Sequence, residues 1–195
     1  MTDSEALQAW FRTPLGRRVA QAEQDVVSGL LASLRPGLVA QLGAAGDPPA
    51  LDVPGAVSQW VVDAAAGSGV DVRSWDDDLP FPSDSLDTVI IIHRLEFGAE
   101  PYALLREAAR VLSPEGHLLI LGFNPLSLWG LRRLAGVPRA GIVPWAGQYY
   151  TRSRLREWCQ VLGLEHRCHR RLLFGPPIQS ERVQQRLARL ERVGG

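Results

Sequence analysis

The stretch from Leu79 to Pro125 switches between two kinds of hydrophobic pattern. Leu86 to Ile92 is a short, β-branched, apolar run that holds one acid, Asp87, near its start. An apolar run without alternation is typical of a strand covered on both faces, as in a parallel sheet. His117 to Gly122 has the same character, so this stretch predicts two buried strands.

A helical stripe separates the two predicted strands. Apolar residues between Tyr102 and Leu112 recur at the spacing that places them on one side of a helix. Pro114 and Gly116 follow and predict its end. Strand, helix and strand in this order predict a right-handed βαβ unit. The charged positions that the stripe leaves to face water are Arg106, Glu107 and Arg110.

The flanking patterns extend this α/β interpretation. Residues 4–34 have helical periodicity with a break near Pro14, where Thr13 and Pro14 are suited to begin a second helical segment. Residues 47–55 contain three prolines and predict a loop. Further strands are predicted at residues 38–42, 58–63, 70–75 and 165–174, and further helices at 126–135, 152–162 and 180–193.

Composition indicates a single globular domain. The chain has 195 residues, 46% of them apolar and 22% charged, which is enough for a sizeable core. Two cysteines, Cys159 and Cys168, are too few for a disulfide framework or a zinc site. There is no signal peptide and no apolar run of roughly 18 residues, so we expect a cytoplasmic protein without a membrane partner.

Charge gives no overall case for nucleic acid, because acids and bases balance to a formal net charge of zero. Basic residues do gather between Arg152 and Arg171, with Tyr149, Tyr150 and Trp158 close in sequence. Such a stretch would follow phosphates while aromatic rings stack on bases. Arginines on a helix are more often a solvated face, and we therefore do not expect a nucleic-acid partner.

Two sequence patterns resemble a known family. Leu79-Pro80-Phe81, with Ser85 and Asp87 behind it, and the later Arg-Val-Leu-x-Pro-Glu-Gly are similar to the second half of class I S-adenosylmethionine-dependent methyltransferases of the type 11 kind. The segment Leu121 to Arg133 resembles a bacterial subgroup of methyltransferase-like proteins. The resemblance implies a Rossmann-like sheet with helices on both faces and S-adenosyl-L-methionine as the cofactor.

The resemblance also locates a glycine-rich cofactor loop, which departs from the family pattern here. The family has an acid followed by G-x-G-x-G, and glycines let the backbone approach a ligand closely. In this chain Gln41 replaces the acid, Gly43 matches the first glycine, Ala45 takes the second position, and Gly46 lies one position out of register. The same stretch is also compatible with an ordinary strand-to-helix turn.

Acids further along match other cofactor contacts of the family. Asp63, at the end of the second predicted strand, matches the residue that accepts hydrogen bonds from the ribose hydroxyls. Asp76 or Asp77, just before Leu79, matches the acid that contacts the adenine amino group. Trp75 is a candidate for stacking on the ring, and Leu79 would line the same site. A solvated acidic turn is the alternative interpretation.

The substrate side is predicted at the ends of the fourth and fifth strands. His93 follows the fourth strand, where open α/β sheets place ligands, and would act as a general base or line the pocket passively. Glu96 is a weaker candidate of the same kind. Asn124 and Trp129 would contact the methyl acceptor, whose identity the sequence does not give.

We expect one domain over residues 1–195. Residues 1–34 would form a helical lid or pack on the sheet edge, 36–125 the cofactor-binding half, and 126–195 the substrate side. A family fold has a further antiparallel strand that this chain lacks, so two sheet edges would be open to a second copy in a homo-oligomer. Two functions stay open: a methyltransferase, or an inactive relative that serves as a binding or scaffold module.

Overall fold

The computed structural model describes residues 3–43, 50–64, 69–126, 147–170 and 172. These residues form a five-stranded parallel sheet in the order β3-β2-β1-β4-β5. The strands are β1 (Gly37–Leu42), β2 (Ala56–Asp63), β3 (Val72–Arg73), β4 (Leu86–Ile92) and β5 (Leu112–Leu121). This order confirms the predicted α/β, Rossmann-like fold class.

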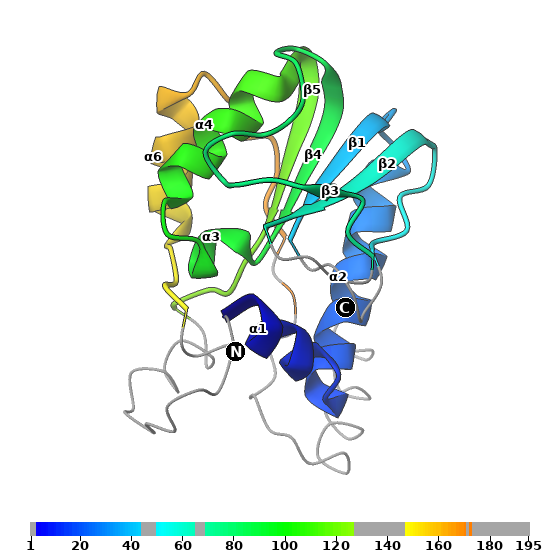
Figure 1. Cartoon of the computed structure of the whole chain (residues 1–195), viewed down its shortest axis with the longest axis vertical. Helices are drawn as coiled ribbons and strands as arrows, with labels where there is room; N and C mark the ends of the chain where they lie inside the picture. The colour runs from blue at the N-terminus through cyan, green and yellow to red at the C-terminus, as the bar shows by residue number, and fades with distance from the viewer. Residues whose placement is uncertain (1–2, 44–49, 65–68, 127–146, 171, 173–195) are drawn as a thin grey trace.

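Helices cover both faces of the sheet (Figure 1). One face carries α2 (Pro14–Leu31), and the other carries α4 (Pro101–Val111) and α6 (Arg152–Val161). Side chains of the inner strand β4 alternate between the two faces. Ile90 and Ile92 pack in the cluster with α2, while Val89 and Ile91 pack in the cluster with α4. Both sets are buried, which is why the strand has no polar alternation.

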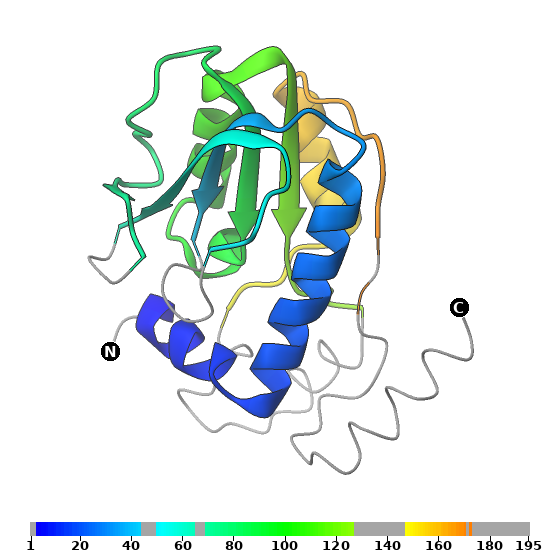
Figure 2. The ribbon, with the colours of Figure 1, turned by 90° about the vertical axis from the view of Figure 1, so that its right-hand side faces the viewer.

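The N-terminal helices reach from the sheet face to its carboxyl edge. Helix α1 (Asp3–Phe11) lies beyond the carboxyl ends of the strands (Figure 2). Thr13 caps α2: its hydroxyl accepts a hydrogen bond from the Gly16 amide at 3.1 Å and donates to the Trp10 carbonyl at 2.7 Å. The turn at Thr13 therefore holds α1 against the carboxyl edge of the sheet, while α2 packs along one face of the sheet. Residues that pack around it include Leu7, Trp10, Phe11, Leu15 and Val19.

Several predicted elements differ from the structure. The third strand is shorter than residues 70–75, because only Val72 and Arg73 pair with β2. The strand predicted over 165–174 is wrong for its described part, where residues 164–170 and 172 are coil and mostly exposed, since no neighbouring strand pairs with them. The helices predicted at 126–135, apart from Leu126 in a turn, and at 180–193 lie outside the described residues.

The helix α4 also corrects the predicted distribution of charge. Arg106 is exposed as expected, but Glu107 is buried and Arg110 is half-buried. Both are drawn inward by polar groups of the loop before β4, which a count of apolar positions does not register. None of the helices in the described part of the chain is long and apolar enough to cross a membrane.

Candidate functional site

Three strand ends meet at the carboxyl edge where the strand order reverses. Gly43 follows β1, Asp63 ends β2, and His93 follows β4. The register pairs Leu42 with both Val62 and Ile91, so these ends lie side by side. In an open α/β sheet, this reversal is where a ligand-binding crevice forms.

Gly43 occupies a backbone position that a side chain does not fit. Its φ is +86°, and its amide donates to the Val62 carbonyl at 3.0 Å. A Cβ on this residue would lie 2.8 Å from the Ile92 carbonyl oxygen and 3.4 Å from Cβ of Arg94. The glycine therefore permits the tight turn out of β1 and the close approach of the segment after β4.

Arg94 joins two acids at this edge. Its Nη1 donates to Asp63 Oδ1 at 3.0 Å, and its Nε donates to Asp76 Oδ1 at 2.8 Å. The side chain of Asp63 is 1% exposed, whereas that of Arg94 is 16% exposed. The guanidinium thus lies on the solvent side of the Asp63 carboxylate and covers it.

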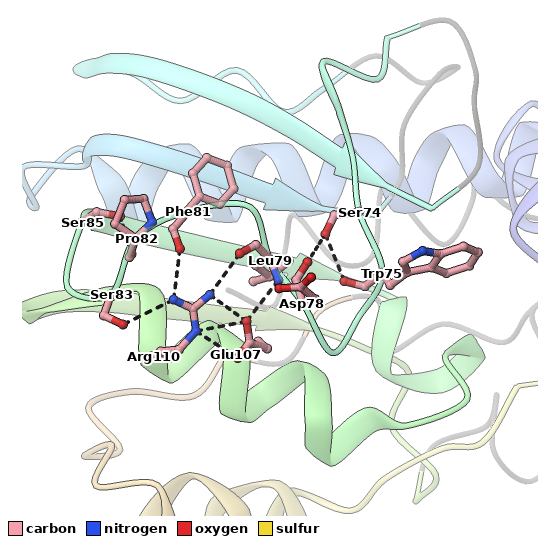
Figure 3. Close-up of polar contacts among 10 residues, drawn as sticks. All are labelled: Ser74, Trp75, Asp78, Leu79, Phe81, Pro82, Ser83, Ser85, Glu107 and Arg110. Atoms are coloured by element: carbon pink, nitrogen blue, oxygen red, sulfur yellow. Dashed lines mark hydrogen bonds and ion pairs between the residues drawn. The ribbon is translucent and has the colours of Figure 1, made fainter.

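The structure brings together some of the predicted cofactor residues and separates others. Gly43, Asp63 and Asp76 converge on Arg94, while Asp77 is exposed on the same turn. Trp75 is 70% exposed and its indole points away from the polar network of its loop (Figure 3). Ala45 and Gly46 lie outside the described residues.

Gln41 has a structural environment on the face covered by α2. It is fully buried, and its Oε1 accepts hydrogen bonds from the Leu51 amide at 2.9 Å and from Gln59 Nε2 at 3.3 Å. Gln59 in turn donates to the Leu51 carbonyl at 2.8 Å, and Gln24 of α2 bonds both backbone groups of Asp52. Side-chain amides therefore hold Leu51 and Asp52, in the connection before β2, against the sheet and α2.

Leu79 lies in a loop anchored from α4 (Figure 3). Its side chain is buried in the core, and its amide donates to Glu107 Oε2 at 3.0 Å. Arg110 donates to the carbonyls of Leu79 and Phe81, both at 3.0 Å, and to Glu107. Hydrogen bonds from Arg110 lower the pKa of Glu107 below its usual range. The Leu-Pro-Phe motif and the Arg of Arg-Val-Leu thus form one structural clamp that fixes the loop carrying Asp76.

His93 lies between two carboxylates. It has a left-handed backbone, with φ of 49°, and it is 1% exposed. Nε2 lies 2.8 Å from Glu23 Oε1, and Nδ1 lies 3.7 Å from Glu96 Oε1. Burial alone would lower the pKa of His93, but Glu23 and Glu96 outweigh it and raise the pKa to about 10. The imidazole is therefore protonated at neutral pH and ties α2 to the carboxyl edge.

Aromatic rings surround this imidazolium. Phe123 stacks on His93 with ring centroids 4.2 Å apart, and Tyr149 stacks on Phe123 at 5.5 Å. Trp10 of α1 meets Phe123 edge to face at 5.9 Å. The Phe123 amide donates to Glu96 Oε1 at 2.7 Å, which fixes the start of the segment after β5.

The remaining substrate-side candidates are less informative. Asn124 is exposed and uses its Oδ1 to accept a hydrogen bond from the Leu126 amide at 2.9 Å, as in an Asx turn. Trp129 lies outside the described residues. Within the described ranges, no group of three or more metal-ligating side chains is assembled.

Two residues of the edge, Arg94 and Glu23, were missed by sequence reasoning. Glu23 had a signal: it interrupts an apolar stripe of α2 at the i, i+4 spacing, and a lone acid on a buried stripe requires a partner. The sequence signal for Arg94 was weaker: the residue stands just after the end of a predicted strand. The stripe consists of Leu15, Val19, Glu23, Val27 and Leu31.

The donor and acceptor chemistry of the edge fits S-adenosylmethionine. Gly43 adds no side chain of its own to this edge, and the carboxylates of Asp63 and Asp76 are the kind of group that accepts hydrogen bonds from hydroxyl and amino groups. Both carboxylates already engage the donors of one guanidinium, which shows that they face a common point.

Comparison with known proteins identifies similar sequences. Residues 51–120 match the model of the methyltransferase domain family. The uncharacterised protein YafS of Escherichia coli strain K12 is 40% identical over 110 residues, which cover 56% of this chain and 45% of that protein. The ubiquinone/menaquinone biosynthesis C-methyltransferase UbiE of Ruegeria sp. strain TM1040 is 34% identical over 70 residues, covering 36% and 28%.

Solved structures share the fold. An S-adenosylmethionine-dependent methyltransferase of Thermotoga maritima, a possible histamine N-methyltransferase, superposes with a TM-score of 0.65 at 19% identity, covering 81% of this chain and 75% of that one. The curated relatives are matched over less than half of their own lengths. Domain sequence and strand order lead to one conclusion: residues 51–120 match the methyltransferase domain family, and the chain has the α/β fold of class I S-adenosylmethionine-dependent methyltransferases.

Proposed function

We propose that the chain binds S-adenosylmethionine at the carboxyl edge of β1, β2 and β4 and transfers its methyl group to an acceptor that remains to be identified. The observation that carries the proposal is the convergence of Gly43, Asp63 and Asp76 at one point of that edge. Asp63 would hold the ribose hydroxyls, Asp76 the adenine amino group, and Gly43 would let the backbone approach the ligand.

Methyl transfer does not require the protein to supply a nucleophile or a metal. When bound, the cofactor supplies an electrophilic methyl group, and an in-line displacement depends mainly on proximity and orientation. The chain's own contribution is a set of hydrogen-bond acceptors and an aromatic wall formed by Trp10, Phe123 and Tyr149. We assign His93 a positioning role, because an imidazolium does not accept a proton at neutral pH.

A second candidate function is that of a non-catalytic module with the methyltransferase fold. The pairing of Arg94 with both acids favours it, because this arrangement gives each carboxylate a cationic partner without a ligand. Gln41 also supports a non-catalytic module, because its side chain binds the Leu51 amide in the connection between β1 and β2. Cofactor binding separates the two candidates.

The remaining expectations are a single domain, a cytoplasmic location and self-association. Support for self-association comes from β5, which pairs on one side only within the described part of the sheet. An open strand edge of this kind is a template for pairing with another chain. Sedimentation at several protein concentrations tests the proposal, and a monomer throughout the range would reject it.

The function is tested by calorimetric titration with S-adenosylmethionine and S-adenosylhomocysteine. We expect the unmodified chain to bind both, and Asp63→Asn to weaken binding by about tenfold or more, because a buried acceptor for two hydroxyls loses its charge. Asp77→Asn is the matched control, an exposed acid on the same turn as Asp76. If millimolar cofactor gives no heat and no thermal shift, methyl transfer by this chain is rejected. The second candidate function, a non-catalytic module, then stands.

A further inference from the structure

The side chain of Arg94 contacts two acids of the predicted cofactor site and lies against its glycine turn. Beyond its bonds to Asp63 and Asp76, the aliphatic stem of Arg94 lies over the β1 turn: its Cβ and Cδ are 3.4 and 3.8 Å from the Cβ position of Gly43. One side chain thus covers the turn, the ribose acid and the adenine acid.

This coverage excludes a ligand from Asp63. The carboxylate of Asp63 is 1% exposed, and Arg94 is the more exposed member of the pair. A ribose hydroxyl and the guanidinium would compete for the same Asp63 Oδ1, which Arg94 Nη1 occupies at 3.0 Å. Because the other carboxylate oxygen, Oδ2, is buried, a ribose hydroxyl that arrives from solvent would have to displace the Arg94 guanidinium to bond Asp63.

The same ion pairs explain why Arg94 rests there. A buried carboxylate without a partner is strongly destabilising, and Arg94 supplies the partner. The residue stands at the first position of α3 (Arg94–Phe97), and its side chain extends from there to both acids. Rotation about side-chain bonds would free both acids without moving a strand, since long arginine side chains change rotamer readily.

We propose that Arg94 is an autoinhibitory plug that pairs with the predicted ribose and adenine acids and has to leave them before the cofactor binds. The inference rests on the proposed function, because it concerns the same site. The apparent affinity for the cofactor equals the intrinsic affinity multiplied by the fraction of molecules in which the plug is open. Shortening Arg94 raises this open fraction and therefore raises the apparent affinity.

The test is titration with S-adenosylhomocysteine, which lacks the sulfonium charge and so limits the effect of removing a positive side chain. Unmodified chain, Arg94→Ala and Arg94→Lys are compared, with Arg106→Ala as the control that removes an exposed arginine from α4. We expect Arg94→Ala to bind about tenfold tighter or more, because two charge-assisted hydrogen bonds no longer have to be broken. Arg94→Lys should be intermediate and Arg106→Ala unchanged.

A double variant shows whether the gain comes from the freed acid. Arg94→Ala combined with Asp63→Asn should lose the tighter binding, whereas a gain that persists without Asp63 overturns the plug. If Arg94→Ala does not fold, as judged by circular dichroism, Arg94→Gln replaces it, because it keeps hydrogen-bond donors without the charge.

The outcomes separate the plug from the function. Binding by the unmodified chain with equal or weaker binding by Arg94→Ala overturns the plug and leaves the function standing. Binding by Arg94→Ala alone supports the plug in its strongest form. No binding by any variant up to millimolar ligand rejects the proposed function, and the plug with it.

Discussion

His93 and Arg94 are neighbours in the chain, yet their side chains bind opposite sides of the carboxyl edge. His93 bonds Glu23 of α2, and Arg94 bonds Asp63 at the end of β2. The left-handed backbone at His93 begins this divergence. A non-glycine residue with positive φ carries strain, and such strain is common at functional sites. The pair thus links the N-terminal helices to the predicted cofactor cradle.

The ion pair between Arg94 and Asp63 should show strong coupling in stability. Arg94→Ala leaves the Asp63 carboxylate buried without this partner, and breaking such a pair costs about 3–5 kcal/mol. Asp63→Asn in the same chain should recover part of that loss, because the amide carries no charge. Urea unfolding of the two single variants and the double variant measures the coupling. Strictly additive losses would contradict it.

Stability should fall as pH rises above 6.5, because of His93. Its pKa is raised from 6.5 to about 10 in the folded protein, so between these values the folded state holds a proton that the unfolded state has lost. The free energy of unfolding then decreases by up to about 1.4 kcal/mol per pH unit. Below pH 6.5 both states are protonated and the contribution is constant.

Unfolding measured from pH 6.5 to 7.5 follows this effect, because Cys159 and Tyr150, whose pKa values are also raised, ordinarily titrate above that range. His93→Gln should flatten the profile, and Glu23→Gln should reduce its slope by removing one of the two facing carboxylates. If the unfolding free energy of His93→Gln still falls with pH at the same slope, a group other than His93 causes the pH dependence.

Arg110→Lys should loosen the loop that carries Asp76. A lysine keeps the charge but cannot donate at once to the carbonyls of Leu79 and Phe81 and to Glu107. We expect a loss of about 1–3 kcal/mol in urea unfolding, because buried acceptors lose their donors. Arg106→Lys, on the exposed side of the same helix, is the control and should change nothing measurable.

Two glycine-to-alanine substitutions should have opposite effects. Gly43→Ala places a Cβ 2.8 Å from the Ile92 carbonyl oxygen at a φ of +86°, and we expect a loss of about 1–3 kcal/mol. Gly29→Ala meets nothing within 4 Å in the interior of α2 and should gain about 0.5–1 kcal/mol from better helix propensity. Thermal unfolding compares them directly, and a tolerated Gly43→Ala would remove the argument for a close-packed turn.

The sequence predicted the elements whose pattern of apolar residues shows which faces are buried. The apolar run at Leu86–Ile92 predicted β4 with its observed bounds, and the stripe ending near Val111 predicted α4. It could not show that Glu107 is buried, because the groups that draw it inward lie in the loop before β4, and Leu79 is 28 residues away. Gln41 likewise looked like a missing acid until the fold placed Leu51 beside it.

What the sequence by itself determined is the parallel sheet, the order of its helices, and the acids and glycine at its strand ends. Periodicity settles these because it records which face of each element is buried. Tertiary structure decided the chemical state of the edge: Glu23 meets His93 across 70 residues, and Arg94 meets Asp63 across 31. Such pairings depend on distance and desolvation in three dimensions, and the local pattern that predicts a strand contains no information about which charge will lie across from its end.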